Sequence, residues 1–216
     1  MGAMAVALLP AAGAALRMGR PKLLLPYAGG TIVGALVASL RAAGVATVAI
    51  VVAPDDAALG DWAAAAGLVV AVNPEPQRGM LSSIREGIAA LGGRGETLLV
   101  SPADLPAVRP TTIVAVVRRR EESRAPLAVP VWQGRRGHPL AIAPEVIPEI
   151  DGLDPGIGLR QLLDRHAGAV LRVAVDDPGV VQDVDTPEDY QVLCGGGDLA
   201  REPGEEERDG PRRPPR

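Results

Sequence analysis

The amino-acid sequence predicts an α/β fold, in which helices cover both faces of a mostly parallel, doubly wound sheet. Short apolar runs rich in Val and Ile alternate with helical segments, and the connections between them are short. The chain has 216 residues, of which 47% are hydrophobic, so one domain with a sizeable core is expected. It contains no Phe and only two Trp and two Tyr, so the core must consist of small aliphatic side chains. Such a core suits a parallel sheet that is buried beneath closely packed helices.

The first half of the chain alternates regularly between strands and helices. The expected strands there are residues 4–9, 45–53, 68–72 and 97–100. Thr31, Asp55 and Asp56 are the kinds of residue that cap helix N-termini, and Gly44 and Gly67 lie where two of the helices should end. The expected helices are residues 31–43, 55–66, a segment from the 79–83 stretch to 91, and 110–124.

The second half of the chain is less regular. Its expected strands are residues 127–132, 140–143 and 170–175, with a short extended piece at 180–184 and a helix at 157–166. A further helix should begin at Thr186, because a hydroxyl cap is followed by Pro187 and two acidic residues. Residues 195–216 are Gly, Pro, Glu and Arg with almost no apolar side chain, so we expect a disordered tail after a domain of residues 1–194.

The bulk composition excludes several classes of protein. A formal net charge of −4 gives no basic surface for nucleic acid. The single cysteine, Cys194, cannot form an intrachain disulfide framework or a cysteine-rich metal site. The N-terminal apolar run lacks a basic leader, and no apolar stretch reaches the roughly 20 residues that span a bilayer. We therefore expect a cytoplasmic protein that does not enter the membrane.

The loop after the first strand has the composition of a phosphate-binding site. Residues 9–13 are small or apolar, and two cations, Arg17 and Lys22, follow them. Small residues allow backbone N–H groups to approach an anion closely, and fixed cations neutralise it. Lys22 is the only lysine in a chain whose other basic residues are arginine, which favours a role that needs a compact ammonium. From the small residues alone, an ordinary Gly/Ala loop is an equally good interpretation.

Two acidic sites are candidates for binding a metal ion. Asp104 follows an apolar strand, at the edge of an α/β sheet where ligands bind, and a carboxylate there suits Mg²⁺. The alternative is that Asp104 only caps the next helix. Asp183 and Asp185 are two positions apart in an extended segment, so both carboxylates could face one cation. Alternatively, Asp185 only supports the helix start, which would leave Asp183 as the ligand.

Two further elements are candidates for binding substrate. Gly79, Met80, Ser82 and Ser83 lie at an expected helix N-terminus, where exposed N–H groups suit an anion or a ribose. A plain helix cap by one of the serines is the competing interpretation. His138 lies in a Gly-His-Pro turn, where a histidine is more often structural than in contact with a substrate.

Together, these motifs resemble the signature of the MobA-like nucleotidyltransferases over roughly residues 4–193. The resemblance lies in Gly13, Arg17, Met18, Gly19 and Lys22 after an N-terminal strand, in the Asp104 and Asp185 motifs, and in residues 79–83. Within that family, residues 10–13 are most similar to the molybdenum cofactor cytidylyltransferases, because guanylyltransferase relatives carry Gly where Ala12 stands. The chain departs from the pattern at Ala15 and Leu81, which replace serines.

The resemblance implies a Rossmann-like domain of the nucleotide-diphospho-sugar transferase type and assigns roles to its residues. Arg17, Lys22 and Asp104 would be catalytic, Mg²⁺ would bind Asp104 with Asp183 or Asp185, and His138 would lie near the acceptor. The nucleotide would contact Leu9, Pro10, Ala11, Ala12, Gly13, Arg17, Lys22, Gly79, Met80, Ser82 and Ser83.

The expected reaction is Mg²⁺-dependent transfer of CMP from CTP to the terminal phosphate of molybdopterin, with release of pyrophosphate. A molybdoenzyme or its chaperone is a possible partner. The alternatives are a guanylyltransferase, a cytidylyltransferase acting on a sugar or polyol phosphate, and a non-catalytic chaperone that binds molybdenum cofactor. The missing serines give the chaperone alternative its support.

Overall fold

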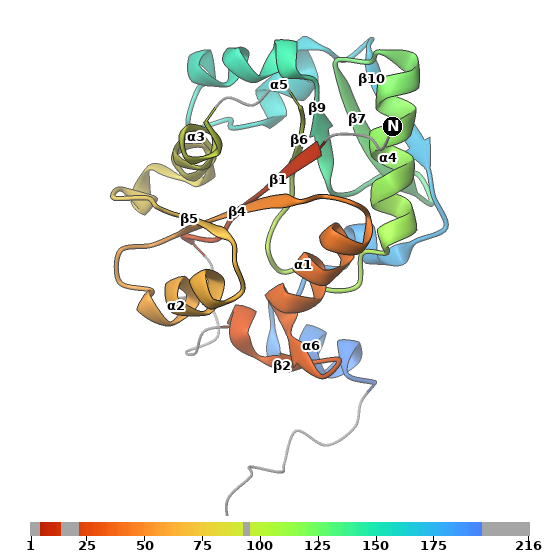
Figure 1. Cartoon of the computed structure of the whole chain (residues 1–216). Coiled ribbons are helices and arrows are strands. Elements are labelled where there is room, and N and C mark those ends of the chain that lie inside the picture. Colours follow the sequence, from red (N-terminus) through yellow and green to blue (C-terminus); the bar gives the residue numbers. More distant parts are fainter. Residues whose placement is uncertain (1–4, 14–21, 93–95, 196–216) are drawn as a thin grey trace, which may run out of the picture.

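The first strand, β1 (Ala5–Pro10), lies near the middle of the main sheet, where the sequence places the start of the phosphate loop (Figure 1). The computed structural model describes residues 5–13, 22–92 and 96–195. Within those ranges, the main sheet has the order β10-β7-β9-β6-β1-β4-β5, with β8 paired to β7. The other strands of this sheet are β4 (Thr47–Val52), β5 (Val69–Val72), β6 (Thr97–Val100), β7 (Leu127–Trp132), β8 (Arg135–Arg136), β9 (Leu140–Ile142) and β10 (Val170–Ala174).

The sheet is mostly parallel, as the alternating pattern predicts. β1 pairs in parallel with both β4 and β6, and β10 pairs in parallel with β7. Among the strands of the described ranges, only β9 and β8 run antiparallel to their neighbours in this sheet. A separate two-stranded hairpin consists of β2 (Pro26–Tyr27) and β3 (Gly30–Thr31).

Helices cover both faces of the sheet, which confirms the single-domain α/β fold. The α-helices of the described residues are α1 (Ile32–Ala42), α2 (Ala57–Ala65), α3 (Met80–Leu91), α4 (Pro110–Ser123), α5 (Arg160–Arg165) and α6 (Pro187–Leu193). The 3-10 helices are η1 (Lys22–Leu24), η2 (Pro76–Arg78), η3 (Pro144–Gly152) and η4 (Pro178–Val181). None of these helices combines the length and the apolar character that crossing a bilayer requires.

The core has two halves because successive side chains of a strand point to opposite faces. In β1, Ala5, Ala7 and Leu9 pack on the face covered by α1, α2 and α4. Val6 and Leu8 pack on the other face, against α3 and η3. The helix α3 lies close to the sheet, because Gly87 has no side chain at the point where it meets Leu8.

The order of the strands reverses at β1, and this reversal positions the site. The chain leaves β1 for β4 and β5 on one side, and then returns to place β6 on the other side. In open α/β sheets, ligands bind beyond the carboxyl ends of the strands at such a reversal. The loops that follow β1 and β6, which carry Gly13 and Asp104, leave the sheet at this point.

The structure differs from the elements predicted from the sequence mainly in the second half of the chain. Residues 180–184 are not one extended piece, because the first two belong to η4, which the Asp177 side chain caps by accepting from the Gly179 N–H. The helix expected at 157–166 is shorter, since α5 begins only at Arg160. The hairpin of β2 and β3, the strand β8 and the 3-10 helix η3 were not expected.

Candidate active site

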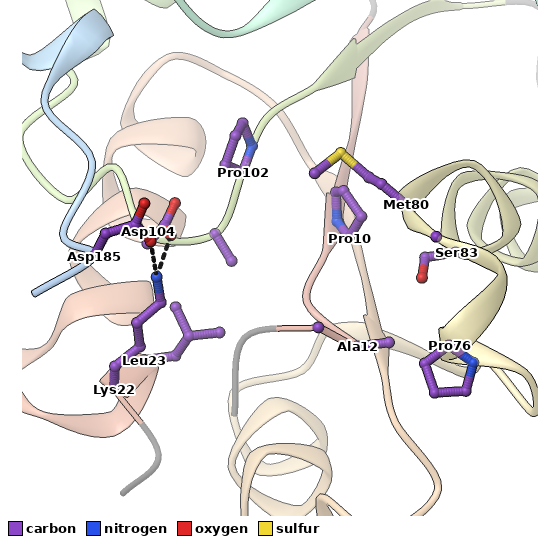
Figure 2. Close-up of a pocket in the computed structure, with 13 residues that line it drawn as sticks. Pro10, Ala12, Lys22, Leu23, Pro76, Met80, Ser83, Pro102, Asp104 and Asp185 are labelled. Atoms are coloured by element: carbon purple, nitrogen blue, oxygen red, sulfur yellow. Dashed lines mark hydrogen bonds and ion pairs between the residues drawn. The ribbon is translucent and has the colours of Figure 1, made fainter. Parts of the chain in front are cut away.

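A pocket of about 270 Å³ lies at the strand reversal beside β1 (Figure 2). Five segments that are distant in the sequence form its wall: the β1 loop, η1, the start of α3, the loop after β6, and the segment before α6. Of the predicted site residues, the pocket is lined by Pro10, Ala12, Gly13, Lys22, Gly79, Met80, Ser83, Asp104 and Asp185.

The described part of the β1 loop contributes Pro10, Ala12 and Gly13 to this wall, and none of these three residues carries a charge. The Ala11 N–H donates to the Val51 carbonyl at 2.8 Å, so the loop continues the sheet beyond β1. Leu9 and Ala11 are buried in the core beneath α1 and do not line the pocket, so any contact that they make with a ligand falls to their backbone. Arg17, the second expected cation, lies outside the described residues.

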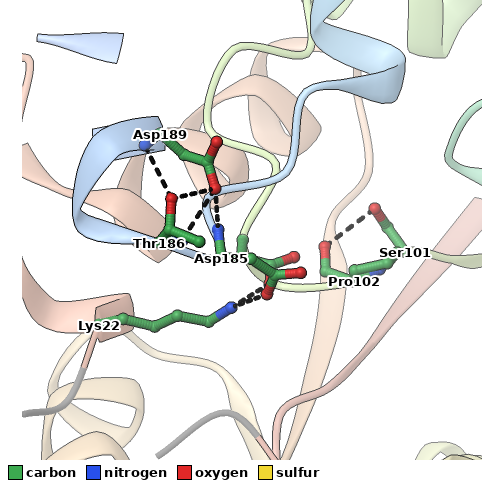
Figure 3. A network of polar contacts seen from close by, with 7 residues as sticks. Lys22, Ser101, Pro102, Asp185, Thr186 and Asp189 are labelled. Carbon is green, nitrogen blue, oxygen red and sulfur yellow. Dashed lines mark hydrogen bonds and ion pairs between the residues drawn. The ribbon is translucent and has the colours of Figure 1, made fainter. Parts of the chain in front are cut away.

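Lys22 lies between two carboxylates (Figures 2 and 3). Its ammonium donates to Oδ2 of Asp104 at 2.6 Å and to Oδ1 of Asp185 at 2.8 Å. Although burial of Lys22 opposes its charge, the hydrogen bonds and negative charges of the two aspartates prevail and raise its pKa. With its side chain only 3% exposed, Lys22 is a fixed, charged ammonium at the pocket wall.

Asp104 presents one carboxylate oxygen that has no partner among the described residues. Its Oδ2 accepts from Lys22, whereas its Oδ1 is buried and accepts no hydrogen bond. Buried acceptors are rarely left unsatisfied in proteins, and a bound ion can satisfy such an atom. The Val184 N–H donates to the Asp104 carbonyl at 3.1 Å, and this bond fixes the two acidic segments side by side.

Of the two acidic residues before α6, Asp185 lines the pocket and Asp183 does not. Asp183 is exposed. The helix start depends on a different aspartate, because Asp189 accepts from the Thr186 backbone and forms a capping box with it (Figure 3). The hydrogen bonds from Thr186 lower the pKa of Asp189. The carboxylate of Asp185 is therefore not the cap of α6 and contacts Lys22 instead.

The start of α3 forms the wall opposite the carboxylates (Figure 2). Gly79 precedes the helix with φ +87°, a backbone conformation that favours glycine. Met80 is 59% exposed, whereas the Ser83 side chain lies deep in the wall at 3%. Ser82 does not line the pocket, because its hydroxyl turns back and donates to the Gly79 carbonyl at 2.7 Å.

A buried asparagine that the motifs did not identify supports this wall. Asn73 follows β5 and is 1% exposed. Its side-chain amide contacts both Ser82 and Ser83. Its position at the carboxyl end of a parallel strand, like that of Asp104, is the one signal in the sequence that could have identified it.

His138 lies near the acidic segment but does not line the pocket. The backbone N–H of His138 donates to the Val180 carbonyl at 2.9 Å, and a cis peptide bond joins His138 to Pro139. Burial of the imidazole ring lowers the pKa of His138. This effect is larger than that of the Val100 carbonyl and of the Asp104 and Asp183 carboxylates, which raise the pKa. The imidazole therefore favours its neutral form.

Within the described ranges, no group of three or more His, Cys, Asp or Glu side chains is arranged to hold a metal ion. The site instead offers two carboxylates, those of Asp104 and Asp185. Mg²⁺ is typically bound through one or two carboxylates, with phosphate oxygens and water completing its shell.

The chain is similar to a known family of protein domains and to individual known proteins. The sequence profile of the MobA-like NTP transferase domain matches residues 7–171. The chain is 31% identical over 193 residues to a nicotine blue oxidoreductase from Paenarthrobacter nicotinovorans, covering 86% of this chain and 94% of that protein. It is 35% identical over 121 residues to a phosphoenolpyruvate guanylyltransferase from Geodermatophilus obscurus, covering 56% of this chain and 52% of that protein.

The fold also matches solved structures over most of the chain. The crystal structure of Rv0371c from Mycobacterium tuberculosis H37Rv superposes with a TM-score of 0.75 at 28% identity, covering 89% of this chain and 98% of that one. A structure of Rv0371c in complex with manganese matches with a TM-score of 0.68 at 27% identity and the same coverage.

Proposed function

The chain belongs to the family of MobA-like NTP transferases, and on that premise we propose that it transfers CMP from CTP to a molybdopterin, with Mg²⁺ as its metal. Nucleotidyl transfer is the activity of the family, and the nucleotide, the acceptor and the metal are the proposed part. The product would be passed in the cytoplasm to a molybdoenzyme or its chaperone.

The position of Lys22 is the observation that carries this proposal. A single buried ammonium joins Asp104 and Asp185 at the strand reversal, and the glycine-containing loop after β1 lies across the same pocket. A triphosphate that is bound together with a divalent ion requires cations and backbone N–H groups for its phosphates, and carboxylates for the ion. No nucleophilic side chain is needed, because the phosphate of the acceptor is already an anionic nucleophile.

The residues present fit a magnesium ion. Asp104 Oδ1 is a buried acceptor without a partner among the residues that the structure describes, and Asp185 contacts the same Lys22 ammonium as Asp104. These two residues would hold the ion, with the remaining positions left to phosphate oxygens and water. When bound, Mg²⁺ would withdraw charge from the phosphate oxygens and so favour attack on the phosphorus atom.

The protein's own groups align the reactants and neutralise charge. An oxygen of the acceptor phosphate forms the new bond to the α-phosphorus, while the bond from that phosphorus to the bridging oxygen breaks and pyrophosphate leaves. Backbone N–H groups near Gly13 bind the triphosphate. Lys22 provides a point charge for the departing pyrophosphate, since its ammonium is fixed at the wall of the same pocket that the loop after β1 lines.

The preference for CTP rests on the β1 loop. Ala12 lines the pocket. A methyl group at this position would leave less space for the base than a glycine would. A narrower space favours a pyrimidine over a guanine. Transfer of GMP, or of CMP to a sugar or polyol phosphate, are the alternatives within the same chemistry, and a chaperone that binds molybdenum cofactor without transfer is the alternative outside it.

Pyrophosphate release tests the proposal. The full-length protein with Mg²⁺ is incubated with CTP, GTP, ATP or UTP, each with molybdopterin, a sugar phosphate or no acceptor. We expect release with CTP and molybdopterin. Because one relative is named an oxidoreductase, a parallel assay follows oxidation of a reduced nicotinamide cofactor. Hydride transfer without pyrophosphate release, or tight cofactor binding without turnover, would refute the proposal.

A further inference from the structure

The strand β5 forms one end of the main sheet, and among the described strands only β4 pairs with it. The Asn73 N–H, directly after β5, donates to the Val52 carbonyl of β4 at 2.9 Å. Successive residues of a strand direct their backbone N–H and C=O groups to opposite sides. The groups of Val70 and Val72 therefore point away from β4, toward the side of β5 on which no described strand lies.

β5 lacks the features that normally prevent an edge strand from pairing with another chain. Natural edge strands carry charged residues or proline, whereas β5 has the sequence VVAV. The strand at the other end of the sheet, β10, carries the exposed Arg172. On β5, Val70 is 37% exposed and Val72 is 51% exposed. An apolar edge with free hydrogen-bonding groups indicates a strand that pairs with a partner.

We propose that two copies of this protein associate through β5, as antiparallel strands about a two-fold axis at Ala71. In antiparallel strands, opposite residues alternately exchange two hydrogen bonds or none. With Ala71 opposite its own copy, Val70 lies opposite Val72 of the second copy, and the outward groups of both residues are paired. In this register both hydrogen-bonded pairs lie within β5. The proposal does not depend on the proposed function.

The helices beside β5 leave room for the second copy. On one face of the sheet, α3 packs on β1, β4 and β5 and is therefore centred on β4. Because neighbouring strands are about 4.8 Å apart, the α3 helices of the two copies would lie roughly 14 Å apart. Packed helices need only about 8–10 Å between their axes, so these two helices do not collide.

The helix α2 adds to the area that the two copies can bury. It packs on β4 and β5 on the opposite face, toward which Val70 and Val72 point. A specific interface buries about 1,200–2,000 Å², which is more than two short strands supply. The exposed residues of α2 are mostly small, and only one of them is charged: Ala57, Ala58, Asp61, Ala64 and Ala65. Such a surface allows the α2 helices of the two copies to approach each other across the exposed valines.

A cysteine on the proposed axis tests this register. The full-length protein carries Cys194→Ser, which removes its only native thiol. The Cα atoms of Ala71 and its copy would be about 4.5 Å apart, within the range that a disulfide spans. Ala71→Cys should therefore form a disulfide-linked dimer under mild oxidation, seen on a non-reducing gel. Val70→Cys is the matched control, since its own copy would lie beyond about 7 Å, and it should cross-link at least roughly tenfold more slowly.

Sedimentation velocity tests the association without a new cysteine. The unmodified protein should form dimers with a dissociation constant in about the micromolar range, as a small interface does. Val72→Lys should raise that constant at least about tenfold, because it places a charge on the paired edge. Val114→Lys is the control, since Val114 is a 45% exposed valine on α4, and it should leave the constant unchanged.

Three outcomes overturn the proposal. The first is a monomer at every concentration up to about 200 μM, which would leave the edge of β5 to a different partner. The second is a dimer that Val72→Lys does not weaken, because such a dimer uses another surface. The third is cross-linking of Val70→Cys as fast as that of Ala71→Cys. The cysteine pair decides the matter even where Val72→Lys does not fold by circular dichroism.

Discussion

The Lys22 ammonium lies 2.6 Å from Oδ2 of Asp104, although 82 positions separate these residues in the sequence. The two lie at the ends of different segments, η1 and the loop after β6, which meet only because the strand order reverses at β1. The pair is largely withdrawn from water, with the Lys22 side chain 3% exposed and that of Asp104 15% exposed. Removing one partner from such a pair leaves an uncompensated charge, so each should be sensitive to substitution.

Asp104→Asn should lower the turnover number by about a hundredfold or more, because a neutral amide would bind the metal ion and the Lys22 ammonium far more weakly than the carboxylate does. The amide has the same shape as the carboxylate, so the protein should remain folded by circular dichroism. Turnover is measured as pyrophosphate release. Turnover near that of the unmodified protein would show that Asp104 is not part of the catalytic machinery.

Asp185→Asn and Asp183→Asn form a matched pair, because only Asp185 lines the pocket and contacts Lys22. Asp185→Asn should reduce turnover at least about thirtyfold, whereas Asp183→Asn should reduce it by less than about threefold. Titration of each variant with Mn²⁺ should show weaker binding only for Asp185→Asn. The reverse order would transfer the role to Asp183.

Lys22→Met should tighten the binding of Mn²⁺ to the nucleotide-free protein by at least roughly tenfold, since two neighbouring carboxylates would lose the cation between them. The same variant should have much lower turnover, because the ammonium is missing when pyrophosphate leaves. Calorimetry gives the affinity and pyrophosphate release gives the turnover. Lys22→Arg should restore little of the turnover, because a planar guanidinium does not match the geometry of a compact ammonium between two carboxylates. Unchanged Mn²⁺ affinity in Lys22→Met would contradict competition between the ammonium and the metal.

Most of the fold could be predicted, because local patterns and tertiary packing agree along the first half of the chain. Residues 97–100 and 127–132 are strands with the expected bounds, and Thr31 caps α1 by accepting from the Gly34 N–H. The pattern failed where a local side-chain bond decides the conformation. Val180 is buried like a strand residue, but the bond between Asp177 and Gly179 winds its segment into η4.

The site could be predicted only as a set of separate motifs. Nothing local tells Asp183 from Asp185, because both precede the same helix. The structure separates them through Asp189, which takes over the capping and leaves Asp185 to contact Lys22. Asn73 was missed for a related reason, since its partners, Ser82 and Ser83, lie nine and ten positions further along and become neighbours only when the chain folds.

Gly87→Ala should destabilise the protein by about 1–3 kcal/mol, because the new methyl group would meet the buried side chains of Leu8 and Val51. Gly60→Ala is the matched control, as this glycine lies inside α2 with open space around it. It should stabilise the protein by about 0.5–1 kcal/mol through helix propensity. Urea unfolding measures both values. Equal stability of the two variants would show that α3 can move away from the sheet.

The stability of the protein should fall as the pH is lowered below about 6.5, and His138 should account for part of that fall. Burial lowers the pKa of His138 below its ordinary value of 6.5, so in this range the unfolded chain binds a proton that the folded protein does not. The free energy of unfolding therefore rises with pH, by at most about 1.4 kcal/mol per pH unit for one proton, and flattens above the unfolded pKa.

Urea unfolding between pH 5 and 7.5 measures this slope, and His138→Gln should reduce it. His166→Gln removes the other histidine, which bonds Glu149 instead, and should leave the His138 contribution in place. A slope that His138→Gln does not change would mean that the ring accepts its proton as readily in the folded protein as in the unfolded chain.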